Sequence, residues 1–249
     1  MNLYQISTIG SFHVNHNEDA LTVNHLNQDK ILLAVLDGCS MGTESHFASC
    51  LLVKIIRKVT KEISFKAFAE KTEKTTASYL KVILQQVFLD LQQISQQLML
   101  EVEEILTTVV LCVLDHTLRE AACIVIGDGL IICNDQCFEY EQGNKPDYLG
   151  YHLQENFEDW YQQQSQKLWL PRVQQLSLAS DGIFSFKHYD TEIYDTITES
   201  EIIDFLLRDQ QWMEQSLMLH KKLLYLENTF GIKPSDDLSI IRIILDAAA

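Results

Sequence analysis

Acidic residues stand at the ends of several short apolar runs in this chain. They are Glu18-Asp19 before 20–24, Asp37 after 31–36, Asp128 between 122–127 and 130–133, Asp181 after 172–180, and Asp236-Asp237 before 238–245. A carboxylate at the end of a buried strand is costly unless its charge is paired, and few cations lie near these acids in sequence. A divalent cation would supply the missing charge. Because the donors are oxygens without a His/Cys cluster, they favour Mg²⁺ or Mn²⁺ over zinc.

A plainer interpretation stays open for each acid taken alone. Asp37, Asp128 and Asp181 are followed by Gly, and Asp-Gly is a common turn dipeptide. Between two apolar runs, Asp128-Gly129 predicts the two-residue turn of a β-hairpin, and a ligand role there would be additional. Five acidic strand ends in one chain favour the metal interpretation.

Hydrophobic periodicity indicates the elements that must position these acids. Strands are predicted over 3–9, 20–24, 31–36, 105–114, 122–127, 130–133, 172–180 and 238–245, and helices over 44–63, 79–98 and 211–227. Thr198 and Glu201 form a capping box, which predicts a further helix starting near 199. Residues 134–170 look irregular, with a short helix over 157–166. Hairpins without regular strand–helix alternation predict an α+β fold with helices packed on antiparallel sheets.

Charge and composition limit the partners and the location. The 249 residues hold 19 Lys+Arg and 35 Asp+Glu, a net charge of −16, which argues against nucleic acid or an anionic membrane as partner. The longest apolar runs hold six residues, too few to span a bilayer. With no leader-like segment and no CxxC pair, we expect free thiols and a cytoplasmic protein. The spacing of Cys133 and Cys137 leaves a disulfide between these two residues as an open alternative. We find no repeat or linker, so 1–249 is predicted to be a single domain.

The acids lie within motifs that resemble those of a known family. In order they are Asn17-Glu18-Asp19-Ala20, Val35-Leu36-Asp37-Gly38, Thr107-Thr108, Ile126-Gly127-Asp128-Gly129, Ala179-Ser180-Asp181-Gly182-Ile183 and Asp236-Asp237-Leu238-Ser239. Together they resemble the metal-dependent protein phosphatases (the protein phosphatase 2C, or PPM, family), in a divergent bacterial-type form, over residues 1–245. The resemblance implies a four-layer αββα sandwich, two antiparallel sheets flanked by helices.

The resemblance also implies a role for each acid. Asp37 would bridge two Mn²⁺ or Mg²⁺ ions, Asp181 and Asp236 would complete the first site, and Glu18 and the Gly38 carbonyl the second. Asp19 would orient the attacking water, and Asp128 would help to hold a weak third ion. Such a two-metal centre hydrolyses phosphoserine or phosphothreonine in proteins through metal-activated water.

Four positions depart from the family pattern. Val14 stands where an Arg usually grips the substrate phosphate, and His13 or His16 nearby would donate more weakly than a guanidinium. Both histidines are equally well interpreted as loop residues. Cys39 follows Asp37-Gly38 where a His or Met is usual, and a buried core thiol is the preferred interpretation over a catalytic acid.

Two further departures concern the third ion and a cation. Ser185 replaces the acid expected four residues after Asp181, so the third metal site should be weak. The sequence Gly-Asp-Gly-Leu at 127–130 replaces the usual Gly-Asp-Ser-Arg and removes a cation. Residues 134–171 correspond to the family's variable flap. Their aromatics and Asn144-Lys145-Pro146-Asp147 are candidates for substrate contact, although core packing is the preferred interpretation for the tryptophans.

Two hypotheses of different classes follow, with a third in reserve. The first is a Mn²⁺- or Mg²⁺-dependent phosphoprotein phosphatase. The second is a pseudophosphatase, a regulatory module that binds a phosphoprotein with little turnover; Val14 and Cys39 favour it and the intact acids oppose it. The third is a hard-metal hydrolase of small phosphoesters. The sequence leaves the substrate, the native metal and the oligomeric state open.

Overall fold

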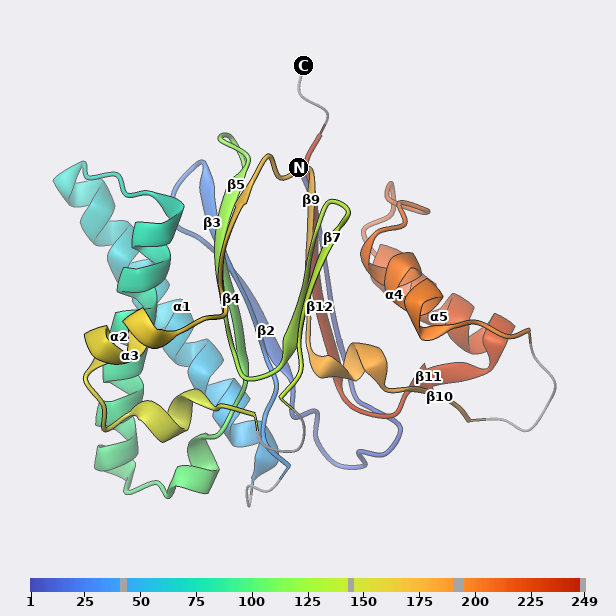
Figure 1. Cartoon of the computed structure of the whole chain (residues 1–249), viewed down its shortest axis with the longest axis horizontal. Coiled ribbons are helices and arrows are strands. Elements are labelled where there is room, and N and C mark those ends of the chain that lie inside the picture. The colour runs from blue at the N-terminus through green and yellow to red at the C-terminus, as the bar shows by residue number, and fades with distance from the viewer. Residues whose placement is uncertain (41–43, 143–145, 190–194, 247–249) are drawn as a thin grey trace.

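Two antiparallel sheets packed face to face form the centre of the molecule, and helices cover their outer faces (Figure 1). The computed structural model describes residues 1–40, 44–142, 146–189 and 195–246. This arrangement confirms the α+β class and the αββα sandwich.

The first sheet is formed by strands from the middle of the chain. Its order is β2 (Ala20–His25), β3 (Lys30–Leu36), β4 (Val109–Asp115), β5 (Glu120–Ile126) and β8 (Lys167–Pro171). Helices α1 (Ser45–Glu70), α2 (Thr76–Leu98) and α3 (Phe157–Gln163) lie on its outer side.

The second sheet brings the two ends of the chain together. Its order is β1 (Asn2–Thr8), β12 (Leu238–Ile244), β9 (Gln175–Ala179), β6 (Gly129–Cys133) and β7 (Gln136–Tyr140). Helices α4 (Glu199–Leu207) and α5 (Met218–Phe230) cover it, and β10 (Phe186–His188) pairs with β11 (Ile232–Pro234) beside it.

The central strands are buried on both faces. In β3, Leu32 packs toward α1 and α2 whereas Leu33 packs between the sheets. Ile241 of β12 shares the layer between the sheets, and Ile240 packs toward α4 and α5. Burial on both sides explains why these strands are continuous apolar runs rather than alternating ones.

The predicted hairpin at Asp128-Gly129 is wrong. Strand β5 pairs with β4 and β8 in the first sheet, whereas β6 pairs with β7 and β9 in the second, so residues 127–128 carry the chain from one sheet to the other. The predicted turn chemistry fails too, because Asp128 does not adopt the positive φ that a two-residue hairpin turn requires; the chain bends with Gly127 at a φ of 81° instead. Because both strands are apolar on both faces, no alternation in the sequence could indicate which strands they pair with.

Several element boundaries differ from the prediction. The strand predicted over 105–114 begins at Val109, since Val102–Ile105 form a 3-10 turn. Helix α1 continues seven residues beyond the predicted end at 63, and α5 begins at Met218 rather than 211. The capping box of Thr198 and Glu201 is confirmed.

The segment 134–171 is more regular than expected. It contributes strands β7 and β8 as well as helix α3, which lies within the predicted 157–166. Core packing is confirmed for Trp160, which is 2% exposed, but is wrong for Trp169, which is 63% exposed on edge strand β8. Residues 143–145 of this segment, including Asn144 and Lys145, lie outside the described residues.

Two further findings concern the cysteines and the helices. All six cysteines are free thiols, so Cys133 and Cys137 form no bridge. None of the described helices is long and apolar enough to cross a membrane. The cytoplasmic location stays a prediction.

Candidate metal centre

The strand ends that carry the acids meet at one edge of the sandwich. In Figure 1 this is the lower edge, where β1, β3 and β9 end and β2 and β12 begin, opposite the two chain termini. The register pairs Thr8 with Leu238 and Ala20 with Leu36. Since Asp19 precedes Ala20 and Asp37 follows Leu36, this pairing places the two carboxylates side by side.

Asp19 and Asp37 carry the strongest electrostatic signal in this region. Burial and the negative charges of Asp37's neighbours, Asp19 first among them, raise the pKa of the Asp37 carboxyl well above its usual range. Burial likewise raises the pKa of Asp19, opposed by a hydrogen bond that the Ser180 hydroxyl donates to its Oδ2 at 2.6 Å. Asp19 Oδ1 is buried without a hydrogen-bond partner among the described residues. Such an atom is costly unless something binds to it.

Asp181 lies at the start of the 3-10 turn that follows β9. Burial, together with the charges of Asp236 and Asp128, raises its pKa to about 6. Asp236 is half-exposed, and its backbone N–H donates to the Ser185 hydroxyl at 3.0 Å. Ser185, which replaces an expected acid, therefore holds the backbone beside a predicted ligand.

Glu18 and Gly38 are joined through the backbone. The Gly38 N–H donates to the Glu18 carbonyl at 3.1 Å, and the Ser40 hydroxyl donates to Glu18 Oε2 at 2.7 Å. A Cβ atom at position 38 would lie 2.2 Å from the backbone oxygen of Ser45, the first residue of α1. Only Gly allows the helix to approach this closely.

The backbone of Asp37 is held by the two threonines just before β4. The Thr108 N–H and the Thr107 hydroxyl each donate to the Asp37 carbonyl at 2.8 Å. The Thr107-Thr108 motif thus fixes the residue that the resemblance makes the bridging ligand.

Asp128 lies at the crossing between the sheets. It is 6% exposed, burial raises its pKa, and its Oδ1 accepts a hydrogen bond from the Gln142 N–H at 2.6 Å. One oxygen is thereby engaged in holding the segment after β7.

Asp237 is a positioning residue to which the sequence analysis assigned no role. Its carboxylate is 1% exposed and accepts hydrogen bonds from the backbone N–H of Gly10 at 2.6 Å and from that of Glu18. It thereby closes the loop 9–17 against the start of β12. The signal in the sequence was the pair of adjacent acids before β12. Because neighbouring residues at the start of a strand face opposite sides, one of the two had to point into the protein.

His13 lies against the same two acids. Its Nδ1 is 2.9 Å from Asp237 Oδ2 and its Nε2 is 3.5 Å from Asp236 Oδ1. Burial alone would lower its pKa, but the nearby carboxylates, that of Asp237 first, raise it above the usual value. Its contact with substrate phosphate stays a prediction, and Val14 beside it is 88% exposed.

Cys39 is buried rather than presented to solvent. It is 6% exposed and packs with Leu106 and Tyr148. Burial and a hydrogen bond with Cys39 raise the pKa of Tyr148. The packing of Cys39 against Leu106 and Tyr148 agrees with its interpretation as a core thiol. The same contact places Tyr148 close to Asp37, which lies two residues before Cys39.

The chemistry of the acids fits a hard divalent cation. All the side-chain donors are carboxylate oxygens, their charges act on one another, and Asp19 Oδ1 has no hydrogen-bond partner in the part of the chain that the structure describes. In the described part of the chain, no group of three or more His, Cys, Asp or Glu residues is arranged to hold an ion as it stands. The carboxylates repel one another, and a cation would draw them together.

Comparison with known proteins identifies the family. A family model for protein phosphatase 2C matches residues 12–219. Comparison with curated proteins gives no match.

Solved structures share the fold at low sequence identity. The serine/threonine phosphatase Stp1 from Staphylococcus aureus is 15% identical, with 99% of this chain and 96% of that chain covered and a TM-score of 0.61. RsbX, solved in complex with magnesium, is 14% identical over 98% and 94% of the two chains, with a TM-score of 0.54. The phosphatase-domain structure of SpoIIE from Bacillus subtilis is 14% identical with a TM-score of 0.60, and the match covers 100% of this chain and 64% of that one. With the family model covering most of its length, this chain belongs to the protein phosphatase 2C family.

Proposed function

We propose that this protein is a Mn²⁺- or Mg²⁺-dependent phosphatase that hydrolyses phosphoserine or phosphothreonine in proteins. The observation that carries the proposal is the gathering of Asp19, Asp37 and Asp181 at one edge of the sandwich, where burial and neighbouring negative charges, including that of Asp236 on Asp37 and Asp181, raise their pKa values. A fold has little reason to gather uncompensated acids unless they bind a cation.

The ions would be held by side chains from both sheets. Asp37, Asp181 and Asp236 would hold the first, and Asp37, Glu18 and the Gly38 carbonyl the second, with Asp128 beside a weaker third. When bound, a pair of such ions lowers the pKa of water and neutralises the oxygens of a phosphoryl group. Neutralisation matters here because a protein of net charge −16 would otherwise repel a phosphorylated substrate.

The chain's own residues would orient the water and the ligands. Asp19 is fixed by the Ser180 hydroxyl on one oxygen, so its free Oδ1 is available to accept a hydrogen bond from the attacking water. Ser40 and Asp237 hold the side chain and the backbone of Glu18 respectively. Such supporting contacts keep ligands in the productive orientation.

The second candidate is a pseudophosphatase that binds a phosphoprotein with little turnover. It is favoured by Val14, which leaves no guanidinium at the usual phosphate position, and by the engagement of His13 with Asp237. Binding would then depend on the acids and their ions without efficient hydrolysis.

Phosphatase assays with and without added Mn²⁺ separate these possibilities. We expect Mn²⁺-stimulated hydrolysis of p-nitrophenyl phosphate and of phosphoserine and phosphothreonine peptides by the wild type. Asp37→Asn and Asp181→Asn should lose it, whereas Asp135→Asn, an exposed acid in the β6–β7 turn, should retain it. Activity that is indifferent to Mn²⁺ and to both substitutions would overturn the proposal. Mn²⁺ binding without turnover of any phosphopeptide would favour the pseudophosphatase.

A further inference from the structure

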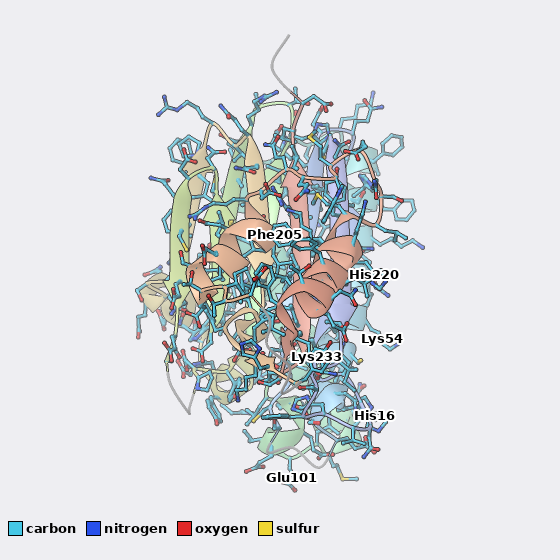
Figure 2. All side chains as sticks on the ribbon, turned by 90° about the vertical axis from the view of Figure 1, so that its right-hand side faces the viewer. His16, Lys54, Glu101, Phe205, His220 and Lys233 are labelled. Atoms are coloured by element: carbon cyan, nitrogen blue, oxygen red, sulfur yellow. The ribbon has the colours of Figure 1, made fainter. Side chains whose placement is uncertain are left out.

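One exposed face of helix α1 carries an ordered stripe of basic and aromatic side chains. Its members alternate at spacings of four and three residues, and they are Lys54, Lys58, Lys61, Phe65 and Phe68. This spacing keeps all five on one side of the helix, opposite buried residues such as Leu52 and Val59. Phe65 is 65% exposed and Phe68 is 86% exposed. Figure 2 shows Lys54 projecting at the edge of the molecule.

The charge around this stripe is opposite to that of the rest of the protein. Residues 54–74 hold seven basic and three acidic residues, a net charge of +4. The remaining residues hold 12 basic and 32 acidic ones, a net charge of −20. Lys58 is paired with Asp90 at 2.8 Å and with Glu62 at 3.7 Å, so its charge is largely neutralised. Among the described residues, no carboxylate lies within ion-pair distance of Lys54 or Lys61.

A groove lies beside the aromatic end of the stripe. It has a volume of about 800 Å³, and its lining includes Phe65, Phe68, Leu26 and Tyr79, residues 27–29 of the β2–β3 turn, and Lys71 and Glu73 just beyond the end of the helix. Glu73 is paired with Lys30 at 2.7 Å. The Lys61 ammonium lies 6.0 Å from the centre of the Phe65 ring. Basic and apolar recognition elements are therefore continuous along the helix.

We propose that this stripe and groove dock an acidic, amphipathic helix of a partner protein. From residue 54 to residue 68 the stripe is about 21 Å long, and its 3–4 spacing matches the seam along which two helices pack. The partner helix would present carboxylates to Lys54 and Lys61 and bulky apolar side chains to Phe65, Phe68 and the groove.

The observations favour a protein over an anionic membrane. The exposed apolar part of the stripe consists of only two side chains, Phe65 and Phe68, beside a groove, whereas an interfacial helix needs a broad apolar face. A membrane would also have to accept the remaining charge of −20 near its surface. The stripe lies toward the end of α1 that is remote from the candidate metal centre (Figure 1), so a docked helix leaves that centre accessible.

Fluorescence anisotropy with a labelled peptide tests the proposal. The probe is a 21-residue helical peptide that carries three Glu and then two Leu on one face, spaced alternately three and four residues apart. A scrambled peptide of the same composition serves as the comparison. We expect saturable binding of the ordered peptide only. Lys54→Glu with Lys61→Glu, and Phe65→Ser with Phe68→Ser, should each weaken it at least tenfold.

Single substitutions elsewhere on the surface control for charge reversal and for the loss of an exposed apolar side chain. Lys66→Glu changes an exposed lysine off the stripe, and Leu118→Ser changes an exposed apolar residue in the β4–β5 turn, so both should bind as the wild type does. A peptide with Lys in place of Glu should restore binding to the Lys54→Glu, Lys61→Glu variant. Equal binding of the scrambled peptide, no saturable binding, or binding of phosphatidylserine vesicles through these residues with no peptide binding would overturn the proposal.

Discussion

The hydroxyl of Ser180 donates a hydrogen bond to Asp19 Oδ2 at 2.6 Å, joining the end of β9 in one sheet to the start of β2 in the other. The same hydroxyl accepts the N–H of Ser239 at 3.0 Å. A single buried side chain thus links three strand ends at the edge where the acids gather. The orientation of Asp19 depends on how the two sheets are packed together.

Replacing Ser180 should therefore impair activity more than a comparable substitution elsewhere. Ser180→Ala removes the donor that fixes Asp19, and loss of such a supporting contact typically lowers metal affinity or activity about 10- to 100-fold. Ser177→Ala is the control, because Ser177 is also buried in β9 but donates to the Leu207 carbonyl at 2.7 Å, away from the acids. Both variants should lose similar stability in urea titrations. Equal activity of the two would contradict the role of Ser180.

The neighbouring acids Asp236 and Asp237 should separate activity from stability. Asp237→Asn weakens the buried acceptor of two backbone N–H groups, so we expect a loss on the order of 2 kcal/mol in the free energy of unfolding, together with lower activity. Asp236→Asn changes a half-exposed group and should leave stability nearly unchanged while reducing metal-dependent activity. Urea unfolding and phosphatase assays on both variants check this. A reversed pattern would mean that their roles are exchanged.

The pH dependence of stability in the metal-free protein should show the signature of Asp181. Burial and the charges of Asp236 and Asp128 raise its pKa from 3.8 to about 6, so the folded state holds the proton more tightly than the unfolded state. Its contribution to stability is present below pH 3.8 and is lost as the pH rises through 6. After chelation, the wild type should lose stability relative to Asp181→Asn between these values.

Urea unfolding at several pH values in the presence of a chelator measures this difference. Saturating Mg²⁺ should reduce it, because the cation replaces the proton as the partner of the carboxylate. Parallel stability curves for the wild type and Asp181→Asn in the chelator would show that Asp181 ionises normally.

The turn after Asp181 should not accept a side chain. In Gly182→Ala the new Cβ would lie 1.9 Å from the backbone oxygen of Asp237, and we expect a loss of about 3 kcal/mol in the free energy of unfolding. Gly231→Ala is the comparison, because Gly231 ends α5 at a φ of 62° and its replacement costs only about 1 kcal/mol. Thermal or urea unfolding of both variants distinguishes a close backbone approach from a helix cap.

The sequence predicted best what is encoded locally. The strands next to Asp19 and Asp37 were recognised from their apolar runs, and the structure pairs them as β2 and β3, so that the two acids lie side by side. The capping box of Thr198 and Glu201 is likewise a local signal, and α4 begins where it indicates. The overall sandwich was expected from the resemblance carried by the motifs.

Long-range partners could not be predicted in this way. The crossing at Asp128 was interpreted as a hairpin because strands buried on both faces carry no alternation that would indicate their neighbours. The Asp237 carboxylate accepts a hydrogen bond from the N–H of Gly10, which is 227 residues away in the sequence. The ring of His13 lies against the other oxygen of the same carboxylate. Such pairings are set by how the sheets stack.

The most direct test of the central claim is electron paramagnetic resonance of chelator-stripped protein loaded with two equivalents of Mn²⁺. If Asp37 joins two adjacent ions, the wild type should give a spin-coupled spectrum, and Asp37→Asn should give that of isolated ions. An isolated-ion spectrum, the same in the wild type and in Asp37→Asn, would contradict a paired metal centre at this edge of the sandwich.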